Sequence, residues 1–177
     1  MVHMVAAAAP FASTDAHDIG ESRSPRSSWA LPAPSGAYGP LQAWVSSNAW
    51  FDAVMDALAT PEGEALRRGA RVAAGTLLRV AYDDRMSADR STGRGVTTAH
   101  ETVAERLGMS AKTVQRARLL LEAMGLAVTV VGGRYLTNEE REQARRTHGG
   151  DQVRAASTRA LVMPSTPPST RSASRPA

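Results

Sequence analysis

A group of cationic, amide and hydroxyl side chains lies close together in the second half of the chain. Its members are Ser110, Lys112, Thr113, Gln115, Arg116, Arg118 and Arg134. Lysine, arginine and threonine are typical donors to phosphate oxygens, so Lys112, Thr113 and Arg118 suit contacts with a nucleic-acid backbone. Glutamine and arginine pair bidentately with the edges of adenine and guanine, so Gln115 and Arg116 suit base recognition. The group therefore predicts contact with double-stranded DNA.

Capping and turn residues predict two helices that would hold this group. Thr98 and Glu101 have the spacing of a capping box. Gly108 can take the positive φ of a sharp turn, and Ser110 can cap a second helix that Gly125 ends. Apolar residues at spacings of three and four give both helices a buried face: Val103, Ala104, Leu107, Val114, Ala117 and Leu121. The pattern predicts a helix-turn-helix whose second helix enters the major groove.

A β-hairpin is predicted directly after the second helix. Branched residues over 126–131 are followed by Gly132-Gly133 and then by an apolar–polar alternation over 134–137. Two glycines between such runs are a hairpin signal. We expect this hairpin to form a wing, with Arg134 at its tip following the phosphates or the adjacent minor groove.

Two further helices are expected before this module. The first buries an apolar stripe that ends near residue 58, and it begins either at Pro40 or at Asn48. The second begins at Thr60-Pro61, a capping residue followed by proline at the first helical position, and continues to residue 81. Its solvent-exposed side carries arginines that could reach DNA: Arg67, Arg68, Arg71 and Arg79.

Two outer segments suit contacts with a partner. The apolar face before residue 60 could support a homodimer or could simply be core, and its candidate residues are Trp44, Phe51 and Met55. After the wing, Thr137 and Glu140 have the spacing of a capping box and predict a charged helix over 138–147. That helix would lean on the domain or serve a partner.

Composition and spacing argue against several classes of site. The chain has no cysteine, which excludes disulfides and thiolate metal sites. The histidines are scattered without ligand spacing: His3, His17, His100 and His148. The polar loop over 83–95 contains Asp83, Asp84 and Asp89, but it lacks the glycine and closing glutamate of a calcium loop. Asp83 and Asp84, two adjacent aspartates at a helix end, are expected to face solvent. We therefore expect no metal, no cofactor and no catalytic residues.

The domain organisation follows from changes in composition. Residues 1–39 and 148–177 are rich in Ala, Ser, Pro and Arg without a sustained period, so both are expected to be disordered, the second as a basic tail. The role of Trp29 and Tyr38 in the first segment stays open. Residues 40–147 would form one mainly α domain with a small β-hairpin, a three-helix core plus wing preceded by an extra helix. No apolar run approaches the ~20 residues of a membrane span, so a cytoplasmic, nucleoid- or plasmid-associated protein is expected.

The stretch from Thr98 to Leu136 resembles the winged helix-turn-helix superfamily, including MarR-like and GntR-like regulators. More narrowly, residues 103–141 resemble the helix-turn-helix region of actinobacterial plasmid replication initiators. The shared features are Ser110-x-x-Thr113-Val114-x-Arg116, Gly125-Leu126 and Gly132-Gly133-Arg134-x-Leu136-Thr137. The resemblance implies binding to repeated sites at a replication origin. The sequence departs from larger initiators because it has no primase-like or nicking domain, no tyrosine with a His-x-His site and no phosphate-binding loop.

Together these patterns predict a sequence-specific DNA-binding protein, with origin binding in plasmid replication as its setting. A transcriptional regulator, such as a repressor, would use the same module, and sequence does not separate the two. An enzyme is not expected, because no nucleophile, base and orienting group occur together. A winged helix that binds only protein is the remaining alternative, and the cations of the second helix argue against it.

Overall fold

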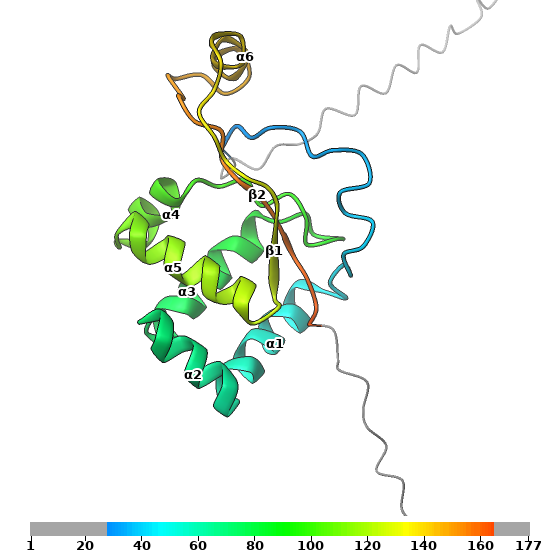
Figure 1. Cartoon of the computed structure of the whole chain (residues 1–177), viewed down its shortest axis with the longest axis vertical. Coiled ribbons are helices and arrows are strands. Elements are labelled where there is room, and N and C mark those ends of the chain that lie inside the picture. The colour runs from blue at the N-terminus through cyan, green and yellow to red at the C-terminus, as the bar shows by residue number, and fades with distance from the viewer. Residues whose placement is uncertain (1–27, 165–177) are drawn as a thin grey trace, which may run out of the picture.

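The computed structural model describes residues 28–164 of the chain. Within this range it contains the following helices and strands (Figure 1): α1 (Ser47–Ala59), α2 (Pro61–Ala70), α3 (Ala74–Ser87), α4 (His100–Leu107), α5 (Ala111–Ala123), β1 (Ala127–Val131), α6 (Asn138–His148) and β2 (Thr158–Leu161). The fold is therefore mainly helical with one small antiparallel sheet.

The first five helices form a body around one apolar core. Its largest buried apolar side chains come from four of these helices, two linking segments and β2: Trp50, Val54, Leu77, Val80, Val96, Val103, Val114, Leu121, Leu126 and Leu161. Trp44 also belongs to this core, where its ring lies 6.3 Å from that of Trp50. Of the two alternatives for Trp44, the core is therefore correct and the exposed dimer face is wrong, because only 4% of its surface is exposed.

Local capping signals set where the first helices begin. Ser46 caps α1 by accepting a hydrogen bond from the Ala49 amide, so the helix starts at Ser47 rather than at Pro40 or Asn48. Thr60 caps α2 in the predicted way, with Pro61 at the first helical position.

The expected single helix from residue 60 to residue 81 is instead two helices. Arg71 adopts a left-handed conformation with φ of 52°, and its amide bonds to the carbonyls of Arg67 and Arg68. This ends α2 and turns the chain, so that Val72 enters the core before α3 begins. The third helix then extends to Ser87, well into the segment predicted to be a loop.

The predicted hairpin over 126–137 does not form. Strand β1 pairs antiparallel with β2, with Ala127 opposite Leu161. The Gly133 amide donates to Ser157 Oγ at 3.0 Å, and a Cβ on Gly133 would lie only 2.6 Å from a backbone oxygen of Ala155. The glycines therefore let two backbones run close together rather than reverse the chain.

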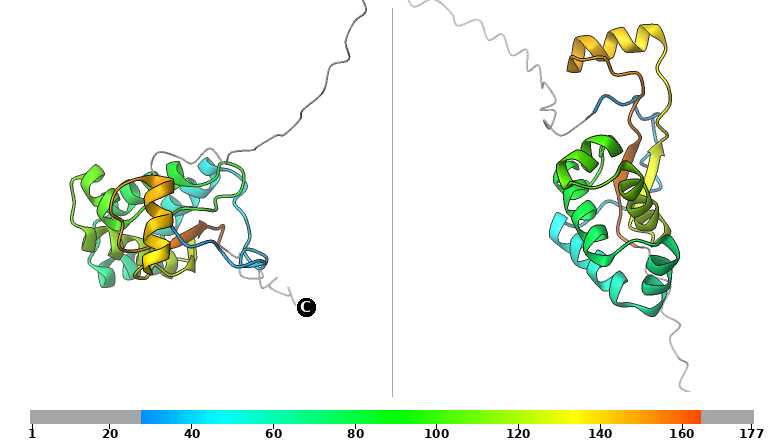
Figure 2. Two further views of the ribbon diagram at one scale, coloured as in Figure 1. Left: turned by 90° about the horizontal axis from the view of Figure 1, so that it is seen from above. Right: turned by 90° about the vertical axis from the view of Figure 1, so that its left-hand side faces the viewer.

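Beyond β1 the chain continues as an irregular ribbon that carries α6 away from the helical body (Figures 1 and 2). The Leu136 amide donates to the Val153 carbonyl at 3.0 Å, and Tyr135 forms an isolated antiparallel β-bridge with Arg154. Thr137 and Glu140 form the predicted capping box at the start of α6. The result is a projecting ribbon with a helix at its far end in place of the predicted tight turn.

Parts of both segments predicted to be disordered are built into the fold. Residues 148–164 contain β2, and Leu161 in it is completely buried. Trp29 is buried in a second apolar cluster with Leu136, Ala144 and Ala155, which holds α6 in place. Residues 1–27 and 165–177, the rest of the two segments, lie outside the described residues.

None of the helices in the described range is both long enough and apolar enough to cross a membrane.

Candidate nucleic-acid interface

The helix pair α4–α5 is joined by the turn that the sequence predicted. Gly108 has φ of 64°, and the Met109 amide donates to the Ala104 carbonyl at 3.0 Å. Ser110 then caps α5, because its Oγ accepts from the Thr113 amide at 3.1 Å. The cap predicted for α4 is wrong: Ala99 takes the capping position without a side-chain bond, and Thr98 is buried.

The outer face of α5 presents polar side chains over its first turns. Lys112 and Gln115 are exposed, and Thr113 and Arg116 are half-buried. The first turn contains no acidic residue, so nothing offsets the partial positive charge of the helix N-terminus. This end of α5 can therefore attract and hydrogen-bond an anionic ligand.

Two arginine side chains connect the α4–α5 pair to neighbouring elements. Arg116 donates from its guanidinium to the carbonyl of Arg71, which links α5 to the turn between α2 and α3. Arg79 of α3 donates to the carbonyl of Leu107, at the end of α4. Both contacts leave further N–H donors on each guanidinium. Of the arginines expected on the solvent-exposed side before residue 81, Arg79 thus contacts the end of α4 through its side chain, and Arg71 contacts α5 through its backbone carbonyl.

Arg118 is not part of this surface. Its side chain is 1% exposed and forms an ion pair with Asp84, whose side chain is also 1% exposed. The Nη2 and Oδ1 atoms are 2.5 Å apart, and Nη1 donates to the Thr98 carbonyl at 2.9 Å. The predicted phosphate contact by Arg118 is therefore wrong, because the residue faces the core and ties α5 to α3.

A second ion pair joins α3 to α4. Arg106 donates to Asp83 through Nε at 2.8 Å and Nη2 at 2.5 Å. Asp83 and Asp84 are both buried, so the expectation that they face solvent is wrong. Their charges are balanced by arginines, and the described residues contain no acid and histidine cluster that could hold a metal.

Arg134 lies on the ribbon beside the start of α6 rather than at a hairpin tip. It donates to both carboxylate oxygens of Glu140, at 2.8 and 2.7 Å, and half of its side chain remains exposed. The hydrogen bond from Arg134, with a further one from the Thr137 amide, lowers the pKa of Glu140 to about 2. To bind an external anion, Arg134 must weaken or break its hydrogen bonds to the Glu140 carboxylate.

A further buried cation, Arg159, lies beside the first residue of α4. Arg159 of β2 lies with Nη2 3.2 Å from His100 Nε2, at the start of α4. Burial, together with the cations of Arg118 and Arg159, lowers the pKa of His100 to about 4. Its imidazole is therefore neutral near pH 7.

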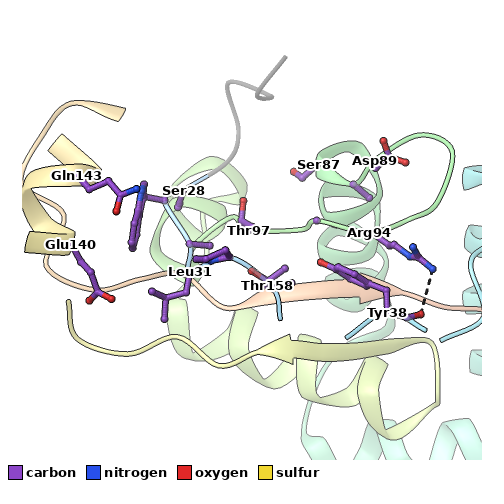
Figure 3. Close-up of a pocket in the computed structure, with 16 residues that line it drawn as sticks. Ser28, Leu31, Tyr38, Ser87, Asp89, Arg94, Thr97, Glu140, Gln143 and Thr158 are labelled. Carbon is purple, nitrogen blue, oxygen red and sulfur yellow. Dashed lines mark hydrogen bonds between the residues drawn. The ribbon is translucent and has the colours of Figure 1, made fainter. Parts of the chain in front are cut away.

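A separate cavity of about 1020 Å³ lies between the N-terminal segment, the loop before α4, and α6 (Figure 3). Arg94 stands at one end, with its guanidinium 4.9 Å from the Tyr38 ring, and Glu140 and Gln143 of α6 stand at the other. None of the residues predicted to contact DNA lines this cavity. Tyr38 thus lines the cavity, whereas Trp29 contributes both to its wall and to the second core.

Comparison with protein-family models, with curated proteins and with solved structures finds no match to this chain.

Proposed function

We propose that this chain is a sequence-specific double-stranded DNA-binding protein and that α5 is its recognition helix. One observation carries the proposal: the outer face of α5 combines exposed Lys112 and Gln115 with half-buried Thr113 and Arg116, beyond a Gly108 turn and a Ser110 cap. This combination offers phosphate and base-edge donors on one rigid helix end without a competing acid.

Each side chain has a role in this proposal. Lys112 and Thr113 fix the register on phosphates, while Gln115 and Arg116 read base edges in the major groove. Arg79 projects from α3 so that its guanidinium contacts the end of α4, where it suits a further phosphate contact. Arg134, on the ribbon, contacts the phosphate backbone of the DNA, and this contact weakens its ion pair with Glu140.

The setting we propose is origin recognition in plasmid replication. It rests on the short motifs that resemble replication initiators, chiefly the start of α5 and the Gly125-Leu126 exit. A transcriptional repressor using the same helix is the alternative, since operator and origin binding share one chemistry. A winged helix that binds only protein is less favoured, because the first turn of α5 carries Lys112 and no acid.

Selection from random duplex DNA at two salt concentrations, followed by sequencing, tests the proposal. We expect a recovered motif and an affinity that falls steeply with salt, since phosphate contacts release counterions. Salt-dependent binding without a motif would leave a nonspecific basic protein, and absence of binding would overturn the proposal. Mapping the motif to a repeated origin array or to a promoter would then separate replication from transcription.

Two substitutions test the assigned roles. Lys112→Ala should weaken binding to all sequences alike and reduce the salt slope by about 0.9, the value for one phosphate contact. Gln115→Ala should relax one base position by roughly 1–3 kcal/mol. Arg146→Ala, which removes an exposed cation from α6, is the matched control and should leave the motif unchanged. If Gln115→Ala kept full discrimination at every position, α5 would not be oriented as we propose.

A further inference from the structure

An aromatic and cationic cluster lies where α1 packs against α3. The rings of Phe51 and Tyr82 meet edge to face with centroids 6.2 Å apart. The Arg85 guanidinium lies 4.6 Å from the centroid of each ring. Two helices thus share a rigid group of large side chains at their outer boundary.

Large apolar side chains extend this cluster into solvent. Met55 is 43% exposed, Tyr82 is 49% exposed and Met86 is 45% exposed. Single exposed apolar residues are common, but a group gathered on one face is typical of an interaction surface. We call the surface made by Phe51, Met55, Tyr82, Arg85 and Met86 the α1–α3 face.

Charges of both signs on this face lack partners. Within the described residues Arg85 forms no ion pair, and apart from its contacts with the two rings its guanidinium donates one long hydrogen bond, to Asn48 Oδ1 at 3.4 Å. Its Nε is buried without an acceptor. Asp52 and Asp56 are exposed on α1, a helix without basic residues, and neither forms an ion pair within the described part of the chain. A cation and two carboxylates therefore stand unpaired around the apolar cluster.

We propose that the α1–α3 face binds the same face of a second copy of this chain. In a two-fold symmetric interface the contact from one copy to the other is repeated in reverse. Arg85 of each copy would then meet Asp52 and Asp56 of the other, with Met55, Tyr82 and Met86 packed between them. A surface that carries both charges is complementary to itself, whereas a partner of one charge would leave one sign unpaired.

Analytical ultracentrifugation of the full chain over a range of concentrations, without DNA, measures the dissociation constant of this dimer. The wild-type chain should be a dimer, and Met86→Glu should weaken it roughly 100-fold because each copy then buries an unpaired charge in the interface. The matched control is Leu119→Glu, which places the same charge at a 54% exposed residue on α5 and should leave the dimer intact. Circular dichroism should show that both variants keep their helices.

A charge exchange between copies gives the sharper test. The double variant Asp52→Arg, Asp56→Arg and the single variant Arg85→Asp should each be monomeric, because like charges would meet across the two-fold axis. Mixed in equal amounts they should form a heterodimer, since every reversed charge then meets an opposite one.

A monomeric wild-type chain, persistent dimers of the single species, or a mixture that stays monomeric would overturn the proposal. Because no DNA is present, these outcomes are independent of whether α5 reads a sequence.

Discussion

The buried pair of Asp84 and Arg118 gives the most direct test of how α5 is held against α3. Replacing Asp84 by alanine removes the acceptor of three contacts, from Nε at 3.2 and 3.1 Å and from Nη2 at 2.5 Å. The Arg118 guanidinium then keeps only the Thr98 carbonyl, in a site from which water is almost fully excluded. The variant therefore leaves a charge buried without its counter-charge.

Breaking a buried ion pair in this way costs about 3–5 kcal/mol of unfolding free energy. That is a large part of the ~5–15 kcal/mol by which domains of ordinary size are stable. With a urea slope of about 2 kcal/mol per molar, the unfolding midpoint of Asp84→Ala should fall by about 2 M. The helical circular dichroism signal in a urea titration measures this midpoint.

Two further variants make the reasoning refutable. Asp151→Ala removes an acid that also pairs with an arginine, but its side chain is 84% exposed, so the midpoint should not move measurably. The double variant Asp84→Leu, Arg118→Met should be more stable than Asp84→Ala, because no charge remains buried. A midpoint for Asp84→Ala close to that of the wild type, or a double variant less stable than the single one, would refute the assignment.

Other predictions concern ionisation and the attachment of α6. The pKa of His100 is lowered from 6.5 to about 4 in the folded chain. The neutral imidazole therefore contributes fully to stability above pH 6.5, and this contribution is lost as pH falls towards 4. In urea titrations at a series of pH values, His100→Gln should flatten this decline. The pKa of Glu140 is lowered from 4.5 to about 2, so the stabilising effect of its carboxylate is present above pH 4.5 and is lost as pH falls through 2. In Arg134→Ala, NMR of the carboxyl groups should show the titration midpoint of Glu140 at a higher pH. Trp29→Ala should speed amide hydrogen exchange in α6 far more than in α1–α5, because Trp29 belongs to the small cluster under α6 and not to the main core; equal acceleration in both would contradict this division.

Local signals in the sequence predicted several helix caps and the turn between α4 and α5. The Ser110 cap, the Gly108 turn and the Thr137 and Glu140 capping box all occur as predicted. Each depends on side-chain and backbone groups within three or four residues of one another, so the required information is local. The Thr60-Pro61 helix start was predicted for the same reason.

The buried pair of Asp84 and Arg118 could have been found from helical periodicity. Arg118 is four residues after Val114 and three before Leu121, which places it on the apolar stripe of its helix. Asp84 follows Val80 by four residues and so lies on the apolar stripe of α3. Opposite charges on two facing stripes indicate a pair, whereas counting Arg118 with its polar neighbours hid its burial.

The strand pairing could not be read from local sequence. Gly132-Gly133 has the composition of a turn, and only the distant β2 shows that the backbone passes close to residues 155–157 instead. The partner strand lay in a segment whose Ala, Ser and Arg content suggested disorder. Burial of Leu161 against the helical core outweighed that composition.

The order of the strands along the chain has a consequence for synthesis on the ribosome. All residues of the helical body and of β1 are made before β2, which is separated from its partner by the ribbon and α6. Until β2 arrives, the nascent chain presents the Ala-Val-Thr-Val-Val edge of β1 with open amides and carbonyls. Closing this long loop is also slow compared with forming the helices. The edge of β1 is therefore the place where a half-made chain is most open to pairing with a neighbour, and a chaperone that shields extended apolar segments would act there.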